Sequence, residues 1–156
     1  MGLLFVVLRA TDDDRSDRRP LAGFPEVGLQ ISDAAGHLFE WCALLAATDA
    51  ARGRGLMGQD DLRGYDAMAF RYDQPSDAAF YMYDTTIPLS LARFDAAGRY
   101  LDQVDMAPCT AADPADCPLY PSARAFTTAL EVPRGDLPAL GIGPGSTLRY
   151  GGSACR

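Results

Sequence analysis

The chain of 156 residues contains no lysine and no asparagine, so all 14 of its basic residues are arginines. Without lysine, the protein cannot form a Schiff base with a carbonyl substrate or a pyridoxal cofactor, and it has no phosphate-loop lysine. Histidine occurs once, at His37 beside Gly36, and we interpret it as a solvated turn residue rather than as part of a Ser-His-Asp triad. Because clustered cysteine and histidine ligands for zinc are also absent, the sequence predicts no cofactor and no metal site.

Long apolar runs are absent as well. No stretch reaches the roughly 18 apolar residues of a membrane-spanning helix, so we predict no transmembrane segment. The net charge of −7 disfavours binding to nucleic acid or to anionic lipid. Residues 2–8 are apolar but lack the basic start and small-residue cleavage site of an intact signal peptide. They are typical either of a first strand or of a signal-peptide remnant whose start lies upstream, and both interpretations stay open.

A polar stretch, 11–20, follows this segment and predicts a linker or mobile loop. Its Asp12, Asp13 and Asp14 lack the glycine turn and terminal glutamate of a calcium loop, so they indicate a solvated charge run. We therefore expect an N-terminal segment with a linker at 1–23, a single β-rich domain at 24–152 and a short tail at 153–156.

From Phe24 onward, short apolar or alternating segments are separated by turn residues every 8 to 12 positions or so. The expected strands are 27–31, 37–47, 68–72, 79–83, 88–94, 99–106, 123–132 and 147–150, with hairpin turns at 32–36 and 95–98. Thr48 is a good N-cap for a short helix at 49–54, and 136–140 predicts one further helical turn. This pattern favours a mainly β fold, a compact β-sandwich or barrel-like single domain with one or two short helices.

Four cysteines are present. Cys109 and Cys117 flank a loop of Ala, Asp and Pro without an apolar stripe, and a disulfide there would contribute about 2.5 kcal/mol. We favour that bridge over two free thiols, which predicts an oxidising, extracytoplasmic setting: secreted, periplasmic or at the cell surface. Cys42 lies in an apolar strand and is expected to be a buried thiol. A bridge between Cys42 and Cys155 is the alternative.

A polar break interrupts two strands at 84–86. The aromatic strand 80–83 is followed by Asp84, Thr85 and Thr86 before an apolar strand resumes. Carboxylate and hydroxyl groups beside Tyr81 and Tyr83 are typical of a shallow polar site at the end of a sheet. Strand alternation places the two tyrosines on the opposite face from Phe80 and Met82. The alternative is a strand-end turn in which Asp84 accepts backbone hydrogen bonds.

Two further features concern the short helix. Gly53, Gly55 and Gly58 have the spacing of a dinucleotide-binding fingerprint, but they follow the expected helix instead of opening it, so we reject that interpretation. Glu131 is one of only three glutamates and lies among apolar residues, where it needs a partner. Arg52 is the natural one, and we expect an ion pair that fixes the helix onto the sheet, with a role in a binding site as the alternative.

Segments 48–57 and 80–89 together resemble the bacterial and archaeal family called domain of unknown function 192. That family shows a Thr-started helical turn with Arg, then Gly-Leu-Met, a Gly-Met-x-Phe strand and Phe-Trp-Met-Lys-Asn-Thr-x-Ile-Pro-Leu-Asp. A Leu-Glu strand and a Gly-Ile-x-x-Gly-Asp turn follow. The matching positions are Arg52, 55–57, Met68, Phe70, 80–89, 130–131 and 141–145, so the resemblance spans roughly 37–150.

The resemblance implies a β-rich, sandwich-like domain, often exported, and it implies no reaction. The pairs at 108–109 and 117–118 resemble a secreted subgroup with a bridged loop. The chain departs from the family pattern mainly at polar positions, with Tyr81 for Trp, Tyr83 for Lys, Asp84 for Asn, Ser90 for Asp and Ser146 for Asp.

Three functions follow as hypotheses. The leading one is a non-catalytic extracytoplasmic module that binds a sugar or small polar ligand, with the candidate residues Tyr81, Tyr83, Asp84, Thr85, Arg52 and Glu131. The second is a hydrolase or lyase that uses Asp84 and Glu131 as a carboxylate pair. The third is a structural or assembly role, which a large exposed apolar patch would favour.

Overall fold

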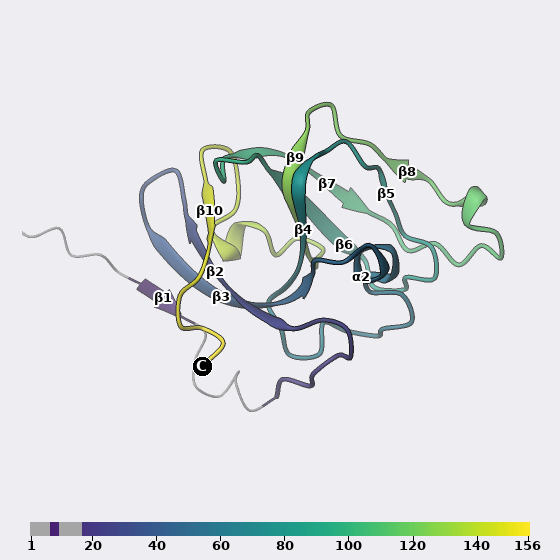
Figure 1. Cartoon of the computed structure of the whole chain (residues 1–156), viewed down its shortest axis with the longest axis horizontal. Coiled ribbons are helices and arrows are strands. Elements are labelled where there is room, and N and C mark those ends of the chain that lie inside the picture. The colour runs from purple at the N-terminus through teal and green to yellow at the C-terminus, as the bar shows by residue number, and fades with distance from the viewer. Residues whose placement is uncertain (1–6, 10–16) are drawn as a thin grey trace, which may run out of the picture.

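The computed structural model describes residues 7–9 and 17–156. Its main element is a mixed sheet of eight strands (Figure 1). The path through the sheet runs β10 (Thr147–Tyr150), β2 (Glu26–Ser32), β3 (Leu38–Ala46), β4 (Ala67–Ser76), β9 (Phe126–Pro133), β6 (Leu89–Phe94) and β7 (Tyr100–Met106). The short β1 (Val7–Arg9) pairs in parallel with β3.

The two ends of this path meet. Arg99 and Thr147 form an isolated antiparallel bridge, and the Tyr100 N–H donates to the Ser146 carbonyl at 3.1 Å. The Leu148 N–H donates to the Gly98 carbonyl at 2.7 Å. Gly98 has a φ of +78°, and a Cβ there would collide with the Leu148 carbonyl, so the contact needs glycine. The sheet is therefore rolled, which confirms the predicted mainly β, barrel-like single domain.

Side chains alternate between the two faces of the sheet and build two apolar clusters. One face packs large residues against the elements that follow β3 and β4 in the chain: Leu44, Met68, Phe70, Leu91, Met106 and Phe126. The other face packs Leu29, Ile31, Leu45, Phe94, Leu130 and Val132 against the 3-10 helix η2 (Pro138–Leu140). Both faces are buried, so β6 and β9 have almost no exposed residue.

A second sheet has only two strands, β5 (Phe80–Tyr81) and β8 (Leu119–Tyr120), in antiparallel register. The 3-10 helix η1 (Pro114–Asp116) precedes β8. Figure 1 shows this small sheet at the opposite end of the molecule from β1 and β10. Phe80 packs its ring edge-on against Phe70, with the centroids 5.1 Å apart, so the small sheet covers the first cluster.

The helix α2 (Asp49–Arg54) forms as the sequence predicts. The Thr48 hydroxyl accepts the Ala51 N–H at 3.1 Å, Asp49 lies in the first turn, and Arg52 and Arg54 lie in the last. Gly55 ends the helix with a φ of +48°, and a Cβ there would lie 3.3 Å from the ring of Phe70. The helix end therefore lies directly against β4.

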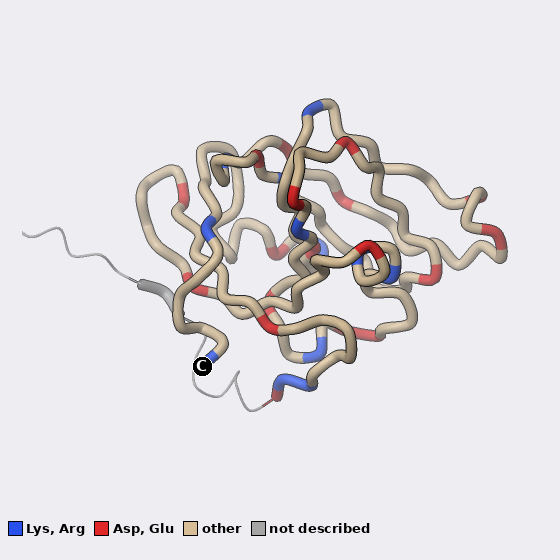
Figure 2. Tube along the Cα trace, viewed as in Figure 1, with Lys and Arg blue, Asp and Glu red and all other residues tan. Residues whose placement is uncertain are grey.

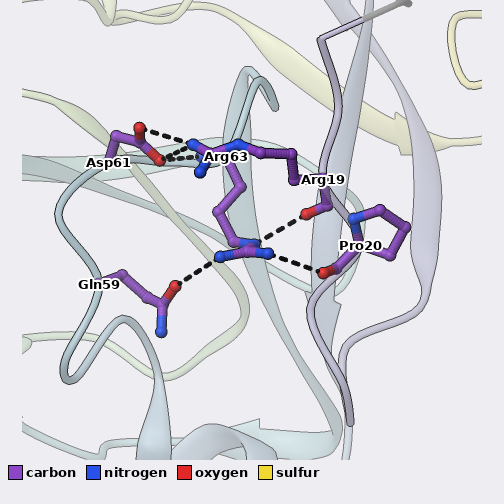
Figure 3. Close-up of polar contacts among 5 residues, drawn as sticks. All are labelled: Arg19, Pro20, Gln59, Asp61 and Arg63. Atoms are coloured by element: carbon purple, nitrogen blue, oxygen red, sulfur yellow. Dashed lines mark hydrogen bonds and ion pairs between the residues drawn. The ribbon is translucent and has the colours of Figure 1, made fainter.

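The chain enters the domain along the loop that precedes β4 (Figure 3). The Arg63 guanidinium donates to the carbonyls of Arg19 and Pro20, at 2.8 and 3.1 Å, and to the Gln59 side chain at 3.3 Å. Arg19 makes a two-oxygen contact with Asp61 at 2.7 Å. The predicted linker is thus fixed at 17–20. Its remaining residues, with Asp12, Asp13 and Asp14, lie outside the described residues.

The four cysteines form two disulfides. The predicted Cys109–Cys117 bridge is confirmed. The expectation of a free, buried Cys42 is wrong, because Cys42 is bonded to Cys155. The Gly151 N–H donates to the Gly28 carbonyl of β2 at 2.8 Å, and Gly28 has no Cβ to block that approach. Since Gly28 is in register with Cys42 of β3, this contact brings the C-terminal segment close to Cys42.

Charged residues are spread over the trace, and Figure 2 shows basic positions interspersed with acidic ones. This distribution agrees with a net charge of −7 and offers no basic stripe in the part of the chain that is described. Within the same part, no helix has the length and apolar character needed to cross a membrane.

Candidate functional site

A cavity of about 70 Å³ lies between α2, β4, β5 and β9. Its walls come from residues 52–57 of the helix and following turn, Phe70 and Tyr72 of β4, 79–81 around β5, Thr85 and Glu131. Four of the six predicted site residues therefore line one cavity: Arg52, Tyr81, Thr85 and Glu131.

Glu131 enters this cavity from the centre of the sheet. It stands on β9 in register with Met68 on β4 and Leu91 on β6, on the face that carries the first apolar cluster. Only 5% of the residue is exposed, and burial raises the pKa of its carboxyl to about 8. Among the described residues, none donates a hydrogen bond to it or forms an ion pair with it. Near neutral pH it is therefore mostly a protonated acid that borders the cavity.

Arg52 does not pair with Glu131, and that expectation is wrong. Its Nη1 donates to the carbonyls of Ala47 and Arg71, at 2.9 and 2.7 Å, and its Nη2 contacts Asp49 at 2.6 Å. The Arg71 carbonyl on β4, the Ala47 carbonyl just after β3 and a carboxylate one helical turn away thus hold the guanidinium away from Glu131. Arg52 fixes α2 onto β4 through the Arg71 carbonyl, in place of the predicted ion pair with Glu131.

Tyr72 forms the wall between Arg52 and the interior. The Arg52 guanidinium lies 4.8 Å from the centre of its ring, and the Phe126 ring packs edge-on at 5.4 Å. Burial is the main cause that raises the pKa of Tyr72, and Glu131 raises it further, whereas Arg52 and Arg93 lower it. Tyr72 is not among the predicted site residues, although it follows Phe70 at the strand spacing that places both side chains on one face.

Arg93 is likewise absent from the predicted site residues, although it is the one charged residue in the apolar run of β6. Its side chain is 2% exposed, with Nη1 donating to Asp102 at 3.0 Å and Nη2 to the Tyr120 carbonyl at 2.6 Å. Its Nε has no hydrogen-bond partner among the described residues. Arg93 therefore ties β6 to β8 behind the rings of Phe80 and Phe126.

Tyr81 and Tyr83 are half-buried and pack against the edge of the first cluster, whereas Phe80 and Met82 lie inside it. The rings of Tyr81 and Tyr83 are nearly parallel, with an interplanar angle of 6° and centroids 6.2 Å apart. Tyr81 borders the cavity, whereas Tyr83 lies outside its lining. The pair gives the cavity an aromatic neighbour on one side.

Asp84 lies outside the cavity lining too. Its side chain is exposed and its φ is +49°, a left-handed conformation that is uncommon for residues other than glycine. Its backbone carbonyl accepts the Gly58 N–H at 3.0 Å. The residue therefore shapes the turn through its backbone, and the structure does not bring Asp84 into the cavity that Glu131 lines.

The Cys109–Cys117 loop supports this wall. Cys109 forms backbone bridges with both Tyr83 and Thr85, and Leu119 pairs with Tyr81 across the small sheet. The Thr85 hydroxyl donates to the Tyr83 carbonyl at 3.0 Å. The disulfide thus closes a loop whose two ends lie against the aromatic segment.

Other parts of the described chain offer weaker sites. Ligand-type atoms of Glu26, Cys42 and Cys155 lie within 4.8 Å of one another, but the two sulfurs are bonded together and are not thiolate ligands. An open depression of about 310 Å³ lies between the loops 33–35 and 138–146. The Asp33 carboxylate at its edge is occupied by the N–H groups of Ala35 and His37 and by the His37 ring.

Solved structures share this fold. A protein described as "a putative transcription regulator", from Sinorhizobium meliloti 1021, is similar with a TM-score of 0.72 and 20% identity, over 84% of this chain and 98% of that one. A protein of unknown function from Novosphingobium aromaticivorans DSM 12444 is similar with a TM-score of 0.69 and 25% identity, over 90% and 98%. At these identities the likeness supports the fold and assigns no function.

No curated protein that was compared with the chain matches it significantly. The family model described as "Uncharacterized ACR" matches residues 31–150, which include α2, the cavity and the Cys109–Cys117 loop. The match covers most of the domain and agrees with the resemblance carried by 48–57 and 80–89. The chain belongs to the family called domain of unknown function 192.

Proposed function

We propose that the protein is a non-catalytic module that binds a sugar or another small polar ligand in the cavity beside Glu131. The observation that carries this proposal is the buried acid itself. Glu131 is 5% exposed and lines the cavity, and no described residue is seen to donate a hydrogen bond to its carboxyl. The carboxyl is therefore open to the cavity, whereas the sealed side-chain atom without a partner in the described part of the chain is the Arg93 Nε. A polar ligand in the cavity would supply the missing hydrogen bonds.

The surroundings of the cavity favour a ligand with a polar end and a flat apolar face. Its volume of about 70 Å³ suits a group of a few atoms, since sites that enclose a whole drug-sized ligand reach about 300–1,000 Å³. The rest of the ligand would then lie outside, next to Tyr81 and its parallel neighbour Tyr83. Aromatic rings of this kind stack on the C–H face of a sugar.

The hypothesis of a hydrolase or lyase has less support. A carboxylate pair must flank the scissile bond, with both groups reaching the same substrate. Glu131 lines the cavity and Asp84 does not. An assembly role has little support either, because among the described residues Leu119 alone is a large hydrophobic residue with high exposure, and one side chain is not a patch.

The two disulfides support an extracytoplasmic setting as part of this proposal. Structural disulfides persist where the environment is oxidising and are rare in the reducing cytosol. One bridge closes the loop beside the proposed site, and the other holds the C-terminal segment against β3.

A thermal-shift screen of the intact protein against neutral sugars, glycans and small polar compounds tests the proposal. A ligand is expected to raise the Tm of the parent and to have a smaller effect on Tyr81→Ala and Glu131→Leu. Arg149→Ala, an exposed change on β10, is the control and should respond like the parent. The proposal is wrong if no compound shifts the parent, or if both site variants respond as the parent does.

A further inference from the structure

Two cations line the cavity, Arg52 and Arg54, and both already have protein partners. The Arg54 guanidinium donates to the Ala22 carbonyl at 3.1 Å and lies 5.3 Å from the centre of the Phe24 ring. The apolar walls of the cavity include Leu56, Phe70 and Phe80, so a charged group that enters would lose hydration. The charge of Arg52 is already matched by Asp49 at 2.6 Å, and two backbone carbonyls occupy its Nη1. A ligand carboxylate would therefore compete with Asp49 for Arg52, and with the Ala22 carbonyl for Arg54.

Among the described groups that surround the cavity, the Glu131 carboxyl is the one whose protonation changes near neutral pH, so its protonation decides what can bind. The charged or titratable residues that line the cavity, or that act on Tyr72 beside it, are Arg52 and Arg54 on α2, Tyr72 on β4, Tyr81 on β5 and Arg93 on β6. Asp49, also on α2, is paired with Arg52. Arginine stays cationic throughout the pH range of interest. Burial raises the pKa of Tyr72 above its ordinary 10 and that of Glu131 to about 8.

A protonated carboxyl has a defined hydrogen-bonding pattern. It presents one O–H donor beside one carbonyl acceptor. Two neighbouring hydroxyls of a sugar match it, because one accepts from the O–H while the other donates to the carbonyl. An ammonium has no acceptor to offer, and a carboxylate has no donor. Two hydroxyls with their carbons also suit the small volume beside Glu131.

We infer that the cavity takes an uncharged polyol, in the form of a neutral sugar that presents two neighbouring hydroxyls to Glu131, and that it rejects sugars charged at that end. This inference rests on the proposed function and narrows its ligand class. The sugar ring would lie against Tyr81, at the cavity rim.

Isothermal titration calorimetry of the intact protein tests the ligand class with matched probes. The probes are glucose, glucuronate and glucosamine, and the corresponding galactose, galacturonate and galactosamine. In at least one set, the neutral sugar is expected to bind at least tenfold more tightly than both charged members at pH 7.0. Raising the pH to 9.5 should weaken binding of that sugar by at least tenfold, because ionised Glu131 loses its donor.

Two variants separate protonation from simple disruption. Glu131→Gln keeps a donor beside an acceptor but cannot ionise. The affinity of this variant for the sugar should therefore be the same at pH 7.0 and at pH 9.5. Glu131→Leu should abolish binding while the protein stays folded, since an apolar side chain of similar size suits the cluster around it.

The outcomes distinguish the two levels of the proposal. If no compound of the wider screen binds, the proposed function fails and this inference fails with it. If a ligand binds at Tyr81 and Glu131 but is not a polyol, or if glucuronate or glucosamine binds as tightly as glucose, the module stands and the inference is overturned. The inference is also overturned if affinity rises with pH, because ionised Glu131 would then be the binding form.

Discussion

Arg52 and Glu131 line the same cavity, yet the guanidinium is bonded to the carbonyls of Ala47 and Arg71 and to Asp49, and not to the Glu131 carboxyl. The arginine thus serves as a tie between α2 and β4. The glutamate remains a buried acid whose pKa is raised by burial without a neighbouring cation to lower it. The two residues therefore make separate and separable contributions to stability.

The first prediction concerns pH. The pKa of Glu131 is about 8 in the folded protein and near 4.5 when exposed, so between these values the folded state holds more protons than the unfolded state. Stability then falls as pH rises, by up to about 4 kcal/mol between pH 5 and 8. Glu131→Gln removes this contribution. Urea unfolding of both proteins at several pH values should show a flatter profile for the variant, and parallel profiles would contradict the assignment.

The second prediction concerns Arg52. Arg52→Met keeps the aliphatic stem but leaves the Ala47 and Arg71 carbonyls without their donor, so the free energy of unfolding should fall by about 2 kcal/mol. Arg54→Met is the control, because Arg54 is exposed and makes one hydrogen bond, to Ala22 at 3.1 Å. A cycle of Arg52→Met with Glu131→Gln should give a coupling energy below about 0.5 kcal/mol. A larger coupling energy would show that Arg52 and Glu131 interact directly, as the rejected ion pair requires.

Local signals in the sequence were sufficient for much of the fold. The capping threonine and following glycine place α2 at Asp49–Arg54, and alternation places β10 at Thr147–Tyr150, as observed. Longer-range features were not predictable in this way. β4 continues to Ser76 through a register irregularity, although 74–77 has the composition of a turn. A bulge next to an exposed strand end admits such residues, and only the partner strand reveals it.

Four of the predicted site residues line the cavity, but the sequence did not predict which groups they contact. Thr85, Tyr81, Arg52 and Glu131 were each singled out by composition or by the family pattern, and the fold brings them to one cavity. Which acceptor an arginine reaches depends on the positions of strand carbonyls, which a sequence does not report. The sequence favoured a free Cys42 over the Cys42–Cys155 bridge for a similar reason. That bridge depends on the path of the last residues along β2, which the sequence does not report.

The third prediction ranks the disulfides. Loop-closure entropy rises with loop length, so the Cys42–Cys155 bridge, with a separation of 113 residues, should contribute about 5 kcal/mol, and the Cys109–Cys117 bridge, with a separation of 8, about 2.5 kcal/mol. The double variants C42A/C155A and C109A/C117A remove one bridge each. Denaturant unfolding without reductant should find the first variant the less stable, and the reverse order would show that strain or residual structure outweighs chain entropy.

The Cys109–Cys117 variant carries a second expectation, which concerns the site. Cys109 bridges the backbone of Tyr83 and Thr85, so loss of the disulfide should loosen this wall and weaken ligand binding more than C42A/C155A does. The comparison is made at a temperature where both variants are fully folded by circular dichroism. Equal loss of the ligand-induced Tm shift in both would assign the effect to global stability.

The fourth prediction concerns Asp84, whose φ of +49° is strained for a side chain with a Cβ. Glycine adopts this conformation without strain but loses more backbone entropy on folding, so Asp84→Gly should change the free energy of unfolding by less than about 1 kcal/mol. Asp84→Val, with a branched Cβ, should lower it by more than that. Because the carboxylate lies outside the cavity, Asp84→Gly should keep the ligand-induced Tm shift of the parent. If the ligand-induced Tm shift is lost while stability is retained, the Asp84 side chain takes part in the site. The hypothesis that Asp84 and Glu131 act as a carboxylate pair would then be supported.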